Sequence, residues 1–241
     1  TMLLEVQDLH VFYGKIEAIK GISFNVNEGE IVSLIGANGA GKTTTLRTIS
    51  GVRPVAQGRV LFEGIDITNM ASHDRVKLGI CQAPEGRGIF PGMTVRENLD
   101  MGTYVRGYKS DTKAADLEHV VHLFPRLGER MTQLGGTLSG GEQQMLAMAR
   151  ALTVNPKLLM VDEMSLGLAP IIVERLLPIL RTIADETGAG VLLVEQHVHM
   201  ALQVADRAYV LSHGQLAMEG NAADMAKDRS LIQASYLGET H

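Results

Sequence analysis

The 241-residue sequence contains no tryptophan, only one cysteine and fewer basic than acidic residues. The lone Cys81 cannot form an internal disulfide, and no paired Cys and His spacing typical of zinc sites occurs, so we expect a reducing compartment. The 22 Lys and Arg against 27 Asp and Glu give a formal net charge of −5. This balance argues against a nucleic-acid-binding surface and predicts no nucleic-acid partner.

Long hydrophobic runs are also missing. The apolar stretches at residues 31–35 and 191–194 are far shorter than the roughly twenty residues that a membrane-spanning helix needs. The first residues do not show the succession of basic, apolar and small residues that is typical of a signal peptide. We therefore expect a cytosolic protein that can work at a membrane only through a partner.

Two hydrophobic periodicities predict the fold class. Residues 22–27 alternate between apolar and polar, which is typical of a half-buried strand in an antiparallel sheet. The mostly apolar runs at 31–35, 158–161 and 191–194 are typical of parallel strands buried on both faces. Helical patterns over 142–154 and 170–187 lie between these runs, and Pro178 is expected to kink the second. The alternation predicts an α/β fold.

The length predicts one domain with an inserted lobe. Residues 72–136 are charged and punctuated by glycine, with a helical pattern over 111–124, so we expect a mostly helical lobe there. Residues 1–71 and 137–241 would then form the core, including an N-terminal antiparallel β part. Residues 207–212 and 215–219 flank His213-Gly214 and predict a hairpin, followed by a short helical tail.

A phosphate-binding loop is predicted between the strand at 31–35 and a helical segment. The residues that fit the P-loop pattern are Gly36, Ala37, Asn38, Gly39, Ala40, Gly41, Lys42 and Thr43. Backbone N–H groups of such a loop close around phosphates, Lys42 can reach the β and γ phosphates, and the Thr43 hydroxyl can ligate Mg²⁺. A plain glycine-rich turn is the alternative, which the strand-loop-helix context disfavours.

Two acidic residues follow the apolar run at 158–161. Ligands of α/β sheets bind at such carboxyl ends of strands. Asp162 is therefore predicted to hold the Mg²⁺ ion and its water shell, and Glu163 is a candidate general base for an attacking water. The alternative is that the two acids only cap a loop, which is less plausible beside a P-loop.

A second glycine motif lies just before the helical pattern at 142–154. Leu138-Ser139-Gly140-Gly141-Glu142-Gln143 resembles the signature of the ABC-transporter family. The resemblance implies a P-loop NTPase fold with a RecA-like parallel core sheet, an inserted helical subdomain, ATP and Mg²⁺ as cofactors, and head-to-tail pairing with a second ATP-binding subunit, identical or different. In that pairing the Ser139 segment closes over the γ-phosphate of the partner's site. A capping box formed by Ser139 and Glu142 is compatible with this reading.

Further matches extend the resemblance over nearly the whole chain. Tyr13 matches the aromatic residue that stacks on adenine in this family, and Thr44 belongs to its phosphate loop. Strings at 84–87, 165–170, 194–196 and 236–238 resemble the ATP-binding subunits of branched-chain amino acid importers. The resemblance implies a motor subunit on the cytoplasmic face of the inner membrane. Its partners would be transmembrane permease subunits, contacted by the 72–136 lobe, and indirectly a solute-binding protein.

Three positions depart from the family pattern. Glu85 stands where most members have a Gln, with Gln82 three residues earlier; Glu85 is expected to ligate Mg²⁺ or water. Gln196 stands where the switch His usually lies, with His197 one place later, and Gln196 is expected to hydrogen-bond the γ-phosphate without titrating. Met164 replaces a common proline, which predicts a looser loop after Glu163.

Other classes of protein share some of these motifs. A soluble ABC ATPase acting on DNA or ribosomes, or a P-loop kinase, would also contain a P-loop. A kinase does not need the second glycine motif, and the single P-loop argues against the fused translation-factor types. Among transporters, a urea, amide or lipid system is an alternative because no residue of this chain is expected to contact the solute.

Overall fold

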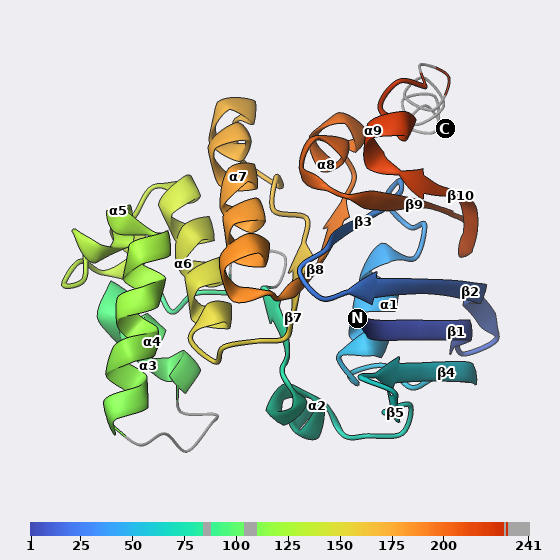
Figure 1. The fold of residues 1–241 in the computed structure, drawn as a ribbon, viewed down its shortest axis with the longest axis horizontal. Helices are drawn as coiled ribbons and strands as arrows, with labels where there is room; N and C mark the ends of the chain where they lie inside the picture. Colours follow the sequence, from blue (N-terminus) through green and yellow to red (C-terminus); the bar gives the residue numbers. More distant parts are fainter. Residues whose placement is uncertain (84–87, 104–109, 229, 231–241) are drawn as a thin grey trace.

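The computed structural model describes residues 1–83, 88–103, 110–228 and 230, and it contains two β-sheets flanked by helices (Figure 1). The first sheet has four strands in the order β2-β1-β4-β5. Its members are β1 (Met2–Tyr13), β2 (Ile16–Asn27), β4 (Gln57–Phe62) and β5 (Ile65–Asp66). The pairs β1 with β2, β1 with β4 and β4 with β5 are all antiparallel, which confirms the expected N-terminal antiparallel part.

The second sheet has six strands in the order β10-β9-β3-β8-β7-β6. They are β3 (Ile31–Ile35), β6 (Ile80–Ala83), β7 (Leu158–Asp162), β8 (Gly190–Glu195), β9 (Arg207–Ser212) and β10 (Gln215–Asn221). Parallel pairing runs from β6 through β7, β8 and β3 to β9, and only the β9–β10 hairpin is antiparallel. The predicted parallel strands and the predicted hairpin are confirmed.

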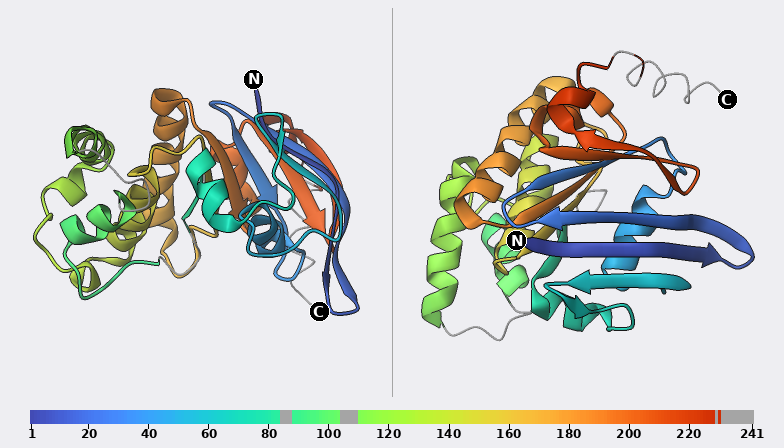
Figure 2. Two further views of the ribbon diagram at one scale, coloured as in Figure 1. Left: turned by 90° about the horizontal axis from the view of Figure 1, so that it is seen from below. Right: turned by 45° about the vertical axis from the view of Figure 1, so that its right-hand side comes forward.

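The helices fall into two groups, one beside the sheets and one apart from the antiparallel sheet. Beside the sheets lie α1 (Lys42–Ile49), α2 (Ser72–Leu78), α6 (Gly140–Leu152), α7 (Pro170–Thr187), α8 (Val198–Val204) and α9 (Ala222–Met225). A separate group of helices contains α3 (Val95–Thr103), α4 (Ser110–Leu123) and α5 (Pro125–Gly128), and Figure 2 shows it away from the antiparallel sheet. Helix α7 continues through Pro178, which lies inside it. No helix within the described residues is long and apolar enough to cross a membrane.

The central strands are mostly apolar because they lie between two hydrophobic cores. Val32 and Leu34 of β3 pack with β1, β2 and α1, whereas Ile31 packs toward α6 and α7. In β8 the same alternation places Leu192 in the first core and Leu193 in the second. Every residue of β3, β7 and β8 is buried, as expected for parallel strands covered on both faces.

The range 72–136 does not separate cleanly from the core. Strand β6 lies within it and pairs with β7 as a member of the six-stranded sheet, and α2 packs against β6. A boundary after β6 therefore describes the helical lobe better than one at Ser72. The four-residue strand was not expected from the sequence.

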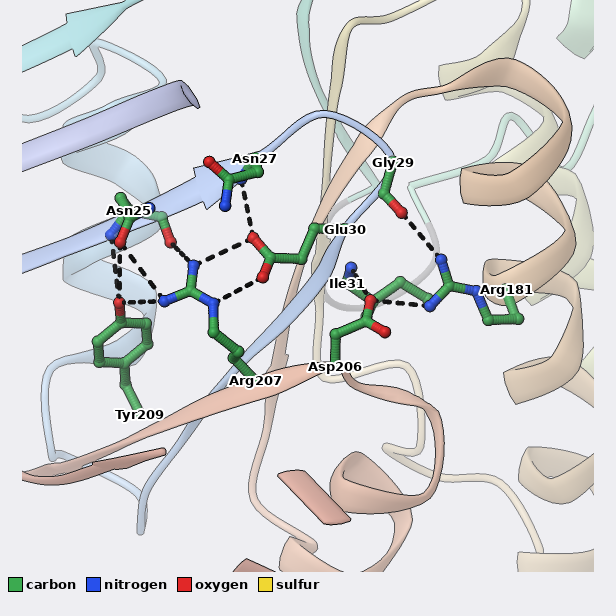
Figure 3. Close-up of polar contacts among 9 residues, drawn as sticks. All are labelled: Asn25, Asn27, Gly29, Glu30, Ile31, Arg181, Asp206, Arg207 and Tyr209. Atoms are coloured by element: carbon green, nitrogen blue, oxygen red, sulfur yellow. Dashed lines mark hydrogen bonds and ion pairs between the residues drawn. The ribbon is translucent and has the colours of Figure 1, made fainter. Parts of the chain in front are cut away.

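A polar network joins the antiparallel sheet to β9 (Figure 3). Arg207 Nε and Nη2 donate to the two carboxylate oxygens of Glu30, at 2.6 and 3.0 Å, and Arg207 also donates to the carbonyl of Asn25. Burial raises the pKa of Glu30, but hydrogen bonds from Arg207 and from the Asn27 amide outweigh it and leave that pKa below its ordinary value. Beside this pair, Asp206 accepts hydrogen bonds from the Ile31 amide and from Arg181, both at 2.8 Å. These contacts fix β9 against the turn that leads into β3.

Candidate nucleotide-binding site

The loop between β3 and α1 is held in a shape that requires glycine at two positions. Gly41 has a φ of +113°, and a Cβ there would lie 2.5 Å from Ile19 Cδ1. A Cβ on Gly36 would lie 2.5 Å from the carbonyl oxygen of Leu211. The backbone therefore passes close to β2 and β9, and the first turn of α1 follows directly from the loop. This is the strand, loop and helix order that a P-loop needs.

The loop borders an open cavity of about 350 Å³. Its floor is formed by Asn38, Gly39, Gly41, Lys42, Thr43 and Thr44, and its other walls by Ile16, Glu17, Ala18, Lys20, Glu163 and His213. The free amide groups at the N-terminus of α1 and the Lys42 ammonium give the floor a positive potential. The cavity is therefore suited to an anion such as a nucleotide polyphosphate.

Lys42 is buried and has two polar partners. Its Nζ lies 3.1 Å from Glu163 Oε1 and donates to the carbonyl of Gly36. Glu163 comes from the loop after β7, so this ion pair joins two segments that are distant in the sequence. A phosphate that binds Lys42 would compete with the Glu163 carboxylate for the same ammonium group.

Thr43, on the cavity floor, lies close to Asp162. Thr43 Oγ1, in the first turn of α1, lies 3.5 Å from Oδ2 of Asp162 at the end of β7. Both offer hard oxygen ligands, and Mg²⁺ is usually bound by one or two carboxylates, several waters and the phosphates of its nucleotide. No group of three or more His, Cys, Asp or Glu suited to a metal occurs among the described residues. One hydroxyl and one carboxylate at this distance fit an Mg²⁺ ion whose remaining ligands are waters and nucleotide phosphates.

Glu163 has an unusual backbone conformation, with a φ of +43°. Its amide donates to the carbonyl of Val194 on the neighbouring β8 at 2.9 Å. A positive φ in a residue with a long side chain costs about 1–3 kcal/mol. Strain of this kind persists where the surrounding structure holds it, and here it directs the carboxylate to the cavity. The sequence predicted a looser loop because Met164 replaces a common proline. Met164 is fully buried in the core, so apolar packing holds the loop at this position.

The turn after β8 brings the candidate switch residues to the end of the sheet. Gln196 is half-buried, whereas His197 is exposed and is the residue before α8. Neither residue lines the cavity. The carboxylate of Glu195, the last residue of β8, accepts hydrogen bonds from Ser165 Oγ and from the amides of Gln196 and His197. Sequence analysis missed Glu195, although an acidic residue at the end of a buried apolar strand was a usable signal.

Tyr13 lies at the end of β1, beside α1. Its hydroxyl is 3.2 Å from Thr44 Oγ1, and its ring is partly exposed. The guanidinium carbon of Arg53 lies 3.7 Å from the centre of the ring, so Arg53 covers one of its faces. Tyr13 is not among the residues that line the cavity, and sequence analysis did not predict the role of Arg53.

The second glycine motif forms the start of α6. Ser139 is the N-cap: its hydroxyl accepts from the Glu142 amide at 3.2 Å, and Glu142 accepts from the Ser139 amide at 3.1 Å. The capping box considered from the sequence is therefore present. A Cβ on Gly141 would lie 2.6 Å from Ile172 Cγ2, so α7 packs closely against this position. Ser139, Gly140 and Gly141 do not line the cavity of their own chain.

The candidates for the Mg²⁺-contact position are Glu85 and Gln82. Glu85 lies outside the described residues, as do the strings at 84–87 and 236–238. Gln82 lies on β6 and lines a different cavity of about 300 Å³, together with Arg150 and Cys81. The structure thus brings together Lys42, Thr43, Asp162 and Glu163, but it does not bring Gln82 to them.

Fold and site together define a nucleotide-binding α/β protein with a P-loop, a parallel core sheet, an antiparallel sheet and an added helical lobe. The chain belongs to the ABC transporter family, whose profile matches residues 19–165. It is thus an ATP hydrolase of the ABC type, and it binds nucleotide. The expected family and fold class are confirmed.

Individual relatives match nearly the whole chain. It is 44% identical over 236 residues to the high-affinity branched-chain amino acid transport ATP-binding protein BraG of Pseudomonas aeruginosa, covering 98% of this chain and 100% of BraG. It is 33% identical over 243 residues to the lipopolysaccharide export system ATP-binding protein LptB of Escherichia coli, covering 98% and 97%. A crystal structure of the ADP conformation of an ABC-transporter cassette superimposes with a TM-score of 0.87 at 27% identity, covering 99% and 100%.

Proposed function

We propose that this chain is the ATP-hydrolysing motor subunit of an importer for branched-chain amino acids. Its similarity to BraG extends over nearly the entire length of both proteins. A probable branched-chain amino acid transport ATP-binding protein, LivF of Archaeoglobus fulgidus, is also 35% identical over 223 residues, with 92% and 94% coverage. The identity to LptB is 33%, lower than the 44% to BraG, and this difference favours amino acid import over the alternative of a lipid system.

The observation that carries the proposed chemistry is the grouping of four residues: Lys42, Thr43 and Glu163 line one cavity, and Asp162 lies 3.5 Å behind Thr43. In the proposal, the Gly36 to Thr44 loop wraps the phosphates of ATP, and Lys42 contacts the β and γ phosphates. Thr43 and Asp162 hold Mg²⁺, with Glu85 as a further candidate ligand. When bound, the ion neutralises phosphate charge and orients the terminal phosphate. The outer face of Tyr13, opposite Arg53, would receive the adenine ring.

Hydrolysis requires a base for the attacking water. Glu163 is the proposed general base because its carboxylate reaches the cavity and pairs with Lys42 at 3.1 Å. A phosphate on Lys42 would compete with that ion pair and free the carboxylate to accept a proton from water. Gln196 would then hydrogen-bond the γ-phosphate from the end of β8 without changing its charge.

A second ATP-binding subunit completes the proposed site. Ser139, Gly140 and Gly141 at the start of α6 do not line the cavity of their own chain, yet the amides of Gly140 and Gly141 in the first turn of the helix suit an anion. In the proposal they close over the γ-phosphate bound by a partner subunit, in a head-to-tail dimer. A solved ATP-binding cassette described as dimeric and bound to ADP and Pi, 25% identical with a TM-score of 0.77, supports pairing.

The proposed place of work is the cytoplasmic face of the inner membrane. Transmembrane permease subunits would bind the helical lobe and carry the solute path, and a solute-binding protein would deliver the amino acid to them. No nucleic acid enters this proposal. Two observations support this location: the relatives BraG and LivF are named as transport ATP-binding proteins, and a helical lobe lies beside the sheets (Figure 2).

The Glu163→Gln variant tests this assignment. We expect its hydrolysis rate to fall by about 10²–10⁴, because general-base assistance is typically worth that much. ATP affinity should be retained or increased, since Lys42 loses a competing carboxylate. Steady-state phosphate release and equilibrium binding of ATP measure the two effects.

Glu63→Gln is a matched control. Glu63 also has a positive φ, of +50°, and also pairs with a lysine, Lys157, at 2.6 Å, but it does not line the cavity. Its hydrolysis rate should equal that of the unmodified protein. A Glu163→Gln protein that keeps more than about a tenth of the normal rate would rule out Glu163 as the base.

A further inference from the structure

Glu195 is a buried carboxylate that the roles described above leave unused. It is the last residue of β8, and only 2% of its surface is exposed. A buried ionised group is unfavourable unless hydrogen bonds compensate for the lost water. The partners of Glu195 therefore indicate what holds it there.

Three donors converge on a single oxygen of Glu195. Oε1 accepts from Ser165 Oγ at 2.6 Å, from the Gln196 amide at 3.0 Å and from the His197 amide at 3.2 Å. Ser165 is itself 93% buried, with 7% exposed, and lies two residues after Glu163. One oxygen atom thus joins the loop of the proposed base to the turn that carries the proposed γ-phosphate contact.

The backbone at the end of β8 anchors two further segments. The Gly36 amide, at the start of the P-loop, approaches the Glu195 carbonyl at 3.4 Å. The Glu163 amide donates to the carbonyl of Val194 at 2.9 Å. The P-loop, the loop after β7 and the turn after β8 therefore share the last two residues of one strand as a reference point.

We propose that Glu195 is a positioning residue for ATP hydrolysis. Through Ser165 it holds the loop after Glu163, and through two backbone amides it holds the turn at Gln196, so that both segments keep one arrangement around the γ-phosphate. This inference rests on the proposed function of Glu163 and Gln196. Glutamine at position 195 keeps an acceptor oxygen for the three donors, whereas alanine removes it.

The test compares kcat, KM and ATP affinity for Glu195→Ala, Glu195→Gln, Ser165→Ala and the Ser165→Ala/Glu195→Ala double variant. Misplacement of a reacting group by about 1 Å can reduce a rate by about 10²-fold. We expect the two single alanine variants to lose about tenfold or more in kcat while ATP affinity stays within about twofold. Glu195→Gln should recover most of the rate. The double variant should be little slower than Glu195→Ala, because both changes break one connection.

Glu30→Ala serves as a control for lost stability, since Glu30 is a largely buried partner of Arg207 in the network of Figure 3 and does not line the cavity. Near-normal kcat in Ser165→Ala and Glu195→Ala, or a loss no larger than that of Glu30→Ala, would overturn the proposal. Multiplication of the two single effects in the double variant would overturn it as well. Ser165→Ala decides the matter if Glu195→Ala does not fold. A normal rate in Glu163→Gln would instead refute the proposed function and this inference together.

Discussion

Single residues at the carboxyl ends of the parallel strands show which parts of the site the sequence could reveal. Gly36 to Thr43, Asp162 and Glu163 were predictable because each group is contiguous and follows an apolar run. The pairing of Lys42 with Glu163 was not, since 121 positions separate the two residues and only the strand order brings them together. Arg53 on the Tyr13 ring was missed for the same reason.

His10 provides a residue-scale prediction about pH. Its Nδ1 lies 2.6 Å from Glu17 Oε1 and its Nε2 lies 3.3 Å from Asp8 Oδ1. The Glu17 hydrogen bond, aided by the charges of Glu17 and Asp8 and opposed by burial, raises the pKa of His10 above its ordinary value of 6.5. A raised pKa in the folded state stabilises the fold below the unfolded-state pKa, and this stabilisation is lost as the pH rises through the folded-state value.

We therefore expect His10→Gln to lower the free energy of unfolding at about pH 6 and to lower it less at about pH 9. Urea unfolding at the two pH values measures the difference. His119→Gln, at an exposed position of α4, should show no such change between the two pH values. An equal effect of His10→Gln on the free energy of unfolding at both pH values would contradict the claim that protonated His10 stabilises the fold.

At the scale of elements, periodicity predicted the long segments and missed the short ones. The patterns at 142–154, 170–187 and 111–124 correspond to α6, α7 and α4 within two residues at each end. Strand β6 was missed because its four residues, Ile80–Ala83, carry no period of their own. It forms a strand because it pairs with the edge of β7, and this long-range pairing leaves no local pattern in the sequence.

The start of α6 allows capping and anion binding to be separated. Ser139→Ala removes the acceptor for the Glu142 amide and should lower the free energy of unfolding by about 1 kcal/mol. Ser139→Asp keeps an N-cap acceptor and should keep most of that stability. In the proposed dimer, however, its negative charge would face the partner's γ-phosphate, so ATP-dependent association should be lost.

Chemical denaturation and light scattering of these two variants measure the two effects. Ser230→Ala is a suitable control, because the Ser230 hydroxyl bonds only the exposed Asp228 among the described contacts and lies far along the chain from α6. If Ser139→Asp associates with ATP as the unmodified protein does, the Ser139 segment has only a capping role.

The whole molecule is organised by the six-stranded sheet, which separates two hydrophobic cores and collects the site residues at one end of its strands. The α/β class followed from the alternation of apolar runs and helical patterns. The boundary of the helical lobe did not follow, because composition changes at Ser72 whereas the sheet continues to Ala83. Partners belong to this scale too, since the Ser139 segment lies outside the cavity of its own chain.

The central claim is the proposed head-to-tail pairing of two ATP-binding subunits around ATP, and for two copies of this chain the mass of Glu163→Gln protein in solution tests it most directly. Blocked hydrolysis should preserve the closed state, so light scattering should show a monomer without nucleotide and a doubled mass with saturating ATP. Saturation is verified by equilibrium binding on the same sample. A protein that is saturated with ATP and keeps the monomer mass would contradict the claim.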